Sequence, residues 1–126
     1  IYEGVAYALN SCAEVMRACG IPVRSMMLTG GGANSGLWPD IIASVFGVPT
    51  QVHLMPGEAT SLGAAITAGV GVGLFRDYHH GAQVAKARST HAVNPMWREK
   101  YAETYPIYAQ IYERLKPLFD QIAQLR

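Results

Sequence analysis

The chain has 126 residues, of which 50% are hydrophobic and 15% are charged. That balance is typical of one compact domain and excludes an intrinsically disordered chain. Ten basic residues against nine acidic ones leave a net charge of +1 with neutral histidines, so we expect neither nucleic acid nor an anionic membrane as a partner. No apolar run reaches the roughly 18 to 20 residues of a membrane span, and no signal-peptide pattern is seen. We therefore expect a cytoplasmic protein.

The first 20 residues predict an amphipathic helix that Gly20 and Pro22 end. Its apolar positions keep helical spacing: Ile1, Val5, Leu9, Cys12, Ala13 and Met16. Because neither an initiator methionine nor a capping residue precedes this pattern, we expect a piece of a longer protein. Cys12 and Cys19 would lie about 10 Å apart on the helix, which is too far for a disulfide. We expect both thiols to be reduced and buried.

Residues 25–29 form a short apolar run that ends in three glycines. This pattern is typical of a buried parallel strand that enters a tight loop. The helix that follows begins either at Ser35, which is a good cap, or at Trp38, which would place Pro39 in the first turn. Gly47 ends this helix.

A second strand over 50–54 leads through a Pro-Gly turn into a helix over 58–72. Small side chains fill much of that helix, at Gly63, Ala64, Ala65, Ala68 and Gly69. We expect its backbone to lie very close to a sheet or to another helix. Residues 75–90 form a connection, with a short helix expected near 81–88.

The last segment, from about 95 to 125, predicts one long helical stripe. Large apolar side chains recur there mostly at steps of three and four: Tyr101, Tyr105, Tyr108, Tyr112, Leu115, Phe119 and Ile122. Pro106 and Pro117 each remove a backbone hydrogen bond, so we expect a kink or break near one of them. Tyrosines can stack on bases, but without a basic groove we expect the stripe to pack on its own domain.

The element order predicts an α/β fold, in which parallel strands carry packed crossover helices and a C-terminal helical tail follows. Two strands make an incomplete sheet, because a two-stranded sheet with apolar faces is marginal alone. We expect its partner strands to come from upstream residues or from another chain. The bare sheet edge and the apolar face of the first helix also favour a homo-oligomer.

The chemistry centres on residues 29–35, Thr-Gly-Gly-Gly-Ala-Asn-Ser, between the first strand and the next helix. The glycines allow a flat or anionic ligand to approach the main chain closely. Open α/β sheets bind their ligands at this end of a strand. A purely structural tight turn is the alternative. The loop matches neither GxxxxGK[ST] nor GxGxxG, the two common phosphate-binding fingerprints.

This loop and four further segments resemble the C-terminal end of the FGGY family of carbohydrate kinases, which includes xylulokinase, ribulokinase and glycerol kinase. The segments are EGVAYAL (3–9), LTGGGANSGLW (28–38), GVP (47–49), EATSLGAA (58–65) and AGVG (68–71). Each segment is weak alone, but together their order and spacing are highly specific. The resemblance covers nearly the whole chain.

The resemblance implies an actin-like, ribonuclease H-like ATPase fold of two domains, with ATP and a sugar in the cleft between them. Residues 1–126 would form the later part of the second domain, its nucleotide-binding half. Gly30, Gly31, Gly32 and Ala33 would lie against the nucleotide. Ser35 stands where related kinases carry an asparagine that reaches the adenine edge, so it would either contact adenine or cap the following helix.

The resemblance places the catalytic aspartate and most sugar contacts upstream, so we expect no catalytic residue in this segment. Mg²⁺ would accompany ATP, with its ligands mostly outside the segment. Asp40 and Glu58 fit solvated or capping roles near helix starts. The adjacent His79 and His80 have no third ligand at a suitable spacing, and isolated His53 has no paired carboxylate. These histidines therefore predict neither a metal site nor a catalytic site.

The implied function is ATP-dependent phosphorylation of a ketopentose or a related sugar or polyol. Ser35 with Trp38 is more similar to xylulokinase-type members than to glycerol kinases, so xylulose is the expected sugar. Two alternatives stay open. One is a dinucleotide-binding oxidoreductase fragment, although no acidic residue closes the second strand. The other is a non-catalytic, actin-like interaction module that would use residues 101–122 as its partner-binding face.

Overall fold

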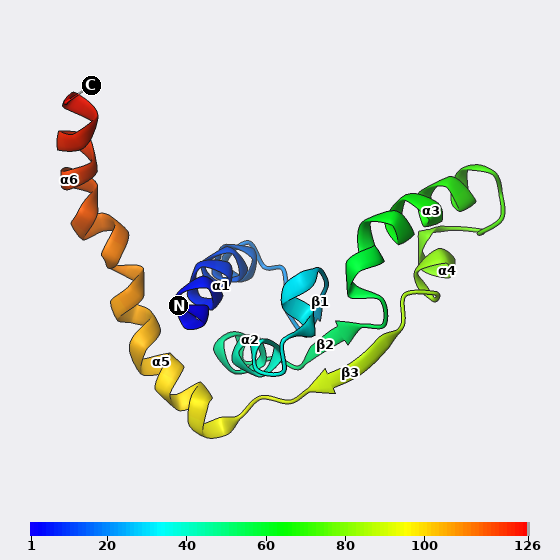
Figure 1. The fold of residues 1–126 in the computed structure, drawn as a ribbon, viewed down its shortest axis with the longest axis horizontal. Helices are drawn as coiled ribbons and strands as arrows, with labels where there is room; N and C mark the ends of the chain where they lie inside the picture. Colours follow the sequence, from blue (N-terminus) through cyan, green and yellow to red (C-terminus); the bar gives the residue numbers. More distant parts are fainter. Residues whose placement is uncertain (126) are drawn as a thin grey trace.

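The computed structural model describes residues 1–125 and has an elongated outline with a small sheet near its centre (Figure 1). The elements in chain order are α1 (Tyr2–Ala18), β1 (Met26–Leu28), the 3-10 turn η1 (Gly31–Asn34), α2 (Trp38–Phe46), β2 (Thr50–His53), the 3-10 turn η2 (Pro56–Glu58), α3 (Ala59–Gly71), α4 (Tyr78–Ala82), β3 (Ala87–His91), α5 (Pro95–Ala109) and α6 (Ile111–Gln124). The predicted α/β order is confirmed from α1 to α3. Of the two starts considered for α2, the later one at Trp38 is observed.

The sheet has three strands in the order β1-β2-β3. β1 and β2 are parallel, as predicted, with Met26 opposite Thr50. β3 runs antiparallel to β2, with His91 opposite Thr50. This strand corrects the expected helix near 81–88, because α4 ends at Ala82 and residues 87–91 are extended. It also shows that one partner strand comes from this chain itself.

The pairing of β2 with β3 contains an irregularity. Val52 lies opposite Ser89, whereas His53 lies opposite Ala87. Arg88 is therefore an extra residue on β3, which is the arrangement of a β-bulge. Bulges redirect side chains, so the direction of Arg88 does not follow from simple alternation along the strand.

Helix α2 forms the centre of the core, since residues 41–46 are all buried and the helix contacts α1, α5 and β2. Its last turn ends at Gly47, whose φ of 68° is the left-handed conformation that glycine adopts most easily. Two arginines bond the carbonyl groups there. Arg98 Nη1 of α5 donates to the Val45 carbonyl at 2.6 Å, and Arg17 Nη2 of α1 donates to the Phe46 carbonyl at 3.0 Å. These bonds tie both neighbouring helices to the end of α2.

Tyrosines pack α5 against α1. The buried ring of Tyr7 lies 5.3 to 5.9 Å, centroid to centroid, from the rings of Tyr101, Tyr105 and Tyr108. The Tyr101 hydroxyl donates to Glu3 Oε1 at 3.1 Å. Burial, followed by this hydrogen bond to a carboxylate, raises the pKa of Tyr101 to about 12. The first half of the predicted stripe therefore packs on its own domain.

The second half of the stripe behaves differently. The helix breaks at Gln110, just after Pro106, which agrees with the expected break near a proline. No residue of α6 is buried within the described part of the chain, and Tyr112 and Ile122 keep 62% and 59% of their surface exposed. Figure 1 shows α6 extending away from the sheet. The prediction that the whole stripe packs on this domain is wrong for α6.

The expected packing of α3 against a sheet or another helix is met by a helix. Among the described residues, α3 packs mainly on α4 and η2. The helix is approached closely at Gly69, where an added Cβ would lie 2.6 Å from the Phe75 ring, and at Ile66, whose side chain would lie 2.6 Å from a Cβ added at Gly81 of α4. Cys12 and Cys19 are free thiols, as expected, but both are exposed and not buried.

Among the described residues, no helix has the length and apolar character to cross a membrane.

We expect Tyr7→Ala to lower the free energy of unfolding by about 3–5 kcal/mol, because the buried ring fills the contact between α1 and α5. Tyr112→Ala is the matched control. Its ring is mostly exposed, so the loss should stay below about 1 kcal/mol. Urea unfolding followed by circular dichroism measures both values. Equal losses would show that the α1–α5 contact does not depend on Tyr7.

Candidate nucleotide-binding site

The glycine loop, residues 29–35, lies at the carboxyl end of β1, where the sequence placed it. Gly30 has φ 76° and ψ −177°, a conformation that is nearly restricted to glycine. The chain then closes the 3-10 turn η1, in which the Ala33 N–H donates to the Gly30 carbonyl at 3.2 Å and the Ser35 N–H donates to the Gly32 carbonyl at 3.1 Å. The loop is therefore an ordered turn that joins β1 to α2.

Gly31 and Gly32 present bare backbone at the surface. Both residues are exposed, and their N–H groups donate to no acceptor within residues 1–125. An added Cβ at Gly31 would meet no atom within 4 Å, whereas one at Gly32 would lie 3.4 Å from the Trp38 indole. A flat or anionic group could thus approach two free main-chain donors with no side chain in the way.

The other two predicted residues use their side chains within the protein. Ala33 is only 2% exposed, so its methyl group faces inward. Ser35 Oγ accepts hydrogen bonds from the N–H groups of Leu37 and Trp38, at 3.3 and 3.2 Å. Ser35 lies two residues before Leu37, the N-cap position of α2, so its hydroxyl bonds the backbone just ahead of that helix.

Two anchors of the loop were missed in the sequence. The Gly30 N–H donates to the Pro56 carbonyl of η2 at 2.6 Å. From β3, Arg88 Nη2 donates to the Ala33 carbonyl at 2.9 Å and to Asn34 Oδ1 at 3.1 Å. The loop itself contains neither lysine nor arginine, so the fold brings a cation to it from more than 50 residues away. No local motif signals this contact.

Asp40 and Glu58, for which solvated or capping roles were expected, differ in their surroundings. Asp40 Oδ1 lies 2.7 Å from His91 Nδ1, and His91 Nε2 lies 3.2 Å from Ser89 Oγ. This chain of contacts ties β3 to the first turn of α2, so Asp40 is neither simply solvated nor a cap. Glu58 is exposed and makes no capping bond through its side chain.

The described residues contain no group of three or more histidine, cysteine, aspartate or glutamate side chains that could hold a metal ion. His53 is buried, and its Nδ1 lies 2.9 Å from the Met55 carbonyl oxygen and 3.1 Å from the Met55 nitrogen. His80 packs edge-on against the Phe75 ring at 5.6 Å. Both rings are therefore engaged in local packing and bonding.

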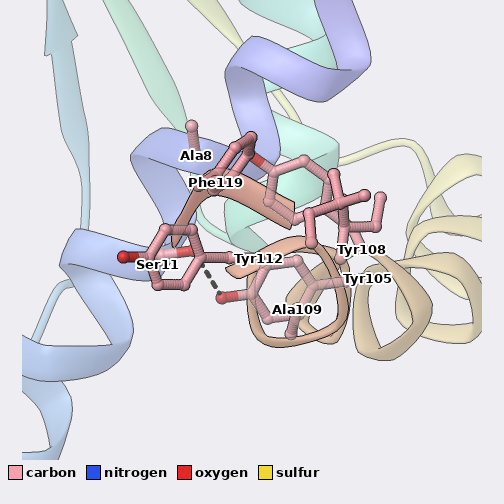
Figure 2. Close-up of a pocket in the computed structure, with 9 residues that line it drawn as sticks. Ala8, Ser11, Tyr105, Tyr108, Ala109, Tyr112 and Phe119 are labelled. Atoms are coloured by element: carbon pink, nitrogen blue, oxygen red, sulfur yellow. Dashed lines mark hydrogen bonds between the residues drawn. The ribbon is translucent and has the colours of Figure 1, made fainter. Parts of the chain in front are cut away.

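A separate groove lies between α1, α5 and α6 (Figure 2). Its volume is about 610 Å³, and its lining is mostly apolar: Ala8, Ser11, Tyr105, Tyr108, Ala109, Ile111, Tyr112, Leu115 and Phe119. The Tyr105 hydroxyl donates to Ser11 Oγ at 3.2 Å across its wall. None of the five predicted nucleotide-binding residues lines this groove, so it is distinct from the glycine loop.

Known kinases have sequences similar to most of this chain. The autoinducer-2 kinase of Klebsiella pneumoniae is 34% identical over 121 residues, which cover 94% of this chain and 23% of that protein. The autoinducer-2 kinase of Yersinia pestis is 48% identical over 75 residues, covering 58% of this chain and 14% of that protein. The chain thus spans about a quarter or less of the length of these relatives.

Solved structures agree on the fold. Gluconate kinase from Lactobacillus acidophilus superimposes with a TM-score of 0.79 at 26% identity, covering 91% of this chain and 23% of that one. Xylulose kinase from Rhodospirillum rubrum gives a TM-score of 0.79 at 25% identity, covering 94% of this chain and 24% of that one.

The family model for the C-terminal domain of the FGGY carbohydrate kinases matches residues 1–72, which include α1, both parallel strands and the glycine loop. Because the matched segment is more than half of the chain, this chain belongs to the FGGY family of carbohydrate kinases.

Proposed function

We propose that this chain forms the adenine-nucleotide side of an ATP-dependent kinase in the cytoplasm, with residues 1–126 acting as one unit. The observation that carries the proposal is the pair of exposed glycines, Gly31 and Gly32. Their N–H groups have no acceptor within residues 1–125, and they lie at the strand end of a carbohydrate-kinase domain. Main-chain donors beside bare backbone suit a flat base or an anionic group. The free cysteines fit a reducing compartment.

The loop is well suited to binding because it is already ordered. Hydrogen bonds to Pro56 and Arg88 hold it from two other segments, and Ser35 joins it to α2. A loop that is fixed before the ligand arrives loses little conformational entropy on binding. Ala33, buried beneath the turn, contributes packing and leaves the contact with ATP to the glycine backbone.

The chain does not supply the chemical step by itself. Phosphoryl transfer needs an aligned nucleophile and stabilisation of charge at the γ-phosphate. Asp40 is engaged with His91, and Glu58 lies exposed at the start of α3. The described residues contain no group of three or more histidine, cysteine, aspartate or glutamate side chains that could hold a metal ion. We therefore assign the proton acceptor and the metal ligands to other parts of the kinase.

The names of the relatives suggest two candidates for the phosphoryl acceptor. The curated relatives that cover most of the chain are named autoinducer-2 kinases, at 34% identity for the Klebsiella protein. The structural relative named xylulose kinase is 25% identical. We place autoinducer-2 first, and xylulose, which Ser35 with Trp38 suggested, second.

Steady-state kinetics of the complete kinase with autoinducer-2, xylulose and gluconate should therefore give the highest kcat/KM for autoinducer-2. A higher value for xylulose would reverse this order. Turnover of none of the three would exclude the whole substrate group.

The 126-residue chain alone should show no sugar-dependent release of ADP, because the proton acceptor is assigned elsewhere. A coupled ADP assay with autoinducer-2, ketopentoses and polyols measures this directly. Turnover by the chain alone at a rate typical of kinases, roughly 1 to 100 per second, would contradict the division of roles proposed here.

In the complete kinase, Gly31→Val should raise the KM for ATP about five- to two-hundredfold and leave the KM for the phosphoryl acceptor nearly unchanged. The added side chain meets open space in the protein, so the loop can fold and the clash falls on the nucleotide.

Asp40→Asn is the matched control for this substitution. Its amide oxygen can still accept a hydrogen bond from His91, so neither KM should change appreciably. Thermal unfolding of both variants checks that they fold. If a folded Gly31→Val enzyme keeps its ATP affinity while Asp40→Asn loses it, the glycine loop is only a structural turn.

A further inference from the structure

We infer that Arg88 is a positioning residue for the nucleotide, because it holds the glycine loop in its binding shape from the neighbouring strand. This inference rests on the proposed function of the loop. It adds a residue that lies outside the loop and outside residues 1–72, the segment that the family model matches.

The first argument is the direction of the side chain. Arg88 is the extra residue of the bulge on β3, between Ala87 opposite His53 and Ser89 opposite Val52. A bulge bends the strand and turns its side chain out of the regular alternation. Here the guanidinium reaches two acceptors on η1, the Ala33 carbonyl and Asn34 Oδ1. The irregularity in the sheet and the contact with the loop therefore involve the same residue.

The second argument is where the loop is held. At its start, the Gly30 N–H is bonded to Pro56 of η2. At its far end, Ala33 and Asn34 are bonded to Arg88. The two free N–H groups, of Gly31 and Gly32, lie between these points. Glycine has more backbone freedom than any other residue, so releasing one end would let this pair sample many orientations.

The third argument concerns charge. Arg88 is exposed, and no carboxylate of residues 1–125 forms an ion pair with it. A guanidinium prefers a carboxylate or phosphate partner when it serves as an ion-pairing group. Both of its bonds here go instead to neutral oxygens of the loop, from the same Nη2 atom. In the ligand-free protein, Arg88 therefore stabilises the backbone of the loop through two hydrogen bonds. We call Arg88 the brace of the loop.

The test compares Arg88→Met and Arg88→Lys with Lys86→Met in the complete kinase. Lys86 is the matched control, because it is an exposed cation two residues away whose side chain makes no hydrogen bond or ion pair with residues 1–125. Calorimetry gives the dissociation constants for ATP and for adenosine. Hydrogen exchange of the bonded amides of Ala33 and Ser35 in the ligand-free protein reports on the order of the loop, and steady-state kinetics separate the two KM values.

A positioning role requires Arg88→Met to weaken ATP and adenosine to the same extent, roughly 5- to 30-fold. The KM of the phosphoryl acceptor should stay unchanged, and amide exchange at Ala33 and Ser35 should become faster. Arg88→Lys keeps one donor and should recover part of the loss, and it also serves if the methionine variant fails to fold. Lys86→Met should change none of these values.

Three results would overturn the inference. Unchanged ATP and adenosine affinities in a folded Arg88→Met protein would show that Arg88 does not position the nucleotide, and would leave the proposed function intact. A loss confined to ATP, with adenosine binding retained and amide exchange of the loop unchanged, would make Arg88 a phosphate contact and not a brace. If the wild-type kinase bound neither ATP nor adenosine, the proposed function would fail and this inference with it.

Discussion

The burial of α2 is the constraint on which the other elements depend. Its residues 41–46 are closed off from solvent by α1, α5 and the sheet. A helix end buried in this way needs partners for its last carbonyl groups, and Arg17 and Arg98 supply them from two different helices. The hydrophobic contacts of α2 and these two hydrogen bonds both join α1 and α5 to the last turns of α2. Displacing α2 would therefore separate α1 and α5 from the sheet at once.

The position of the glycine loop follows from that constraint. The loop has β1 on one side and the first turn of α2 on the other, and Ser35 bonds directly to the start of the helix. Asp40, also in that first turn, reaches His91 of β3. The sheet edge that carries Arg88 is thus tied to the same helix that the loop precedes. Packing in the core, and not the loop sequence alone, sets the distance between the loop and its brace.

The sequence was sufficient where local chemistry decides structure. Apolar spacing together with glycine and proline punctuation located α1, β1, α2, β2 and α3 closely, and the start of α2 that Pro39 favoured is the one observed, although Ser35 had left an earlier start open. β3 was missed because its residues are mainly polar and exposed along an edge, so apolar alternation is absent. The predictions that α6 packs on its domain and that the cysteines are buried were wrong. The spacing of apolar residues shows which face of a helix is apolar, but it does not show what covers that face. Arg88 could not be predicted, since its contacts need a strand, a register shift and a turn from distant parts of the chain.

The glycine motif and its brace, Arg88, lie in different segments of the chain, and both bear on the proposed nucleotide site. The glycines offer only main-chain groups, which are much the same in any glycine-rich turn. What distinguishes one such turn from another is how firmly its backbone is held and from which directions. Here one anchor, Pro56, lies within the segment that the family model matches, and the other, Arg88, lies beyond it. If the loop binds the nucleotide as proposed, a substitution on β3 will alter nucleotide affinity while every residue of the glycine motif stays the same.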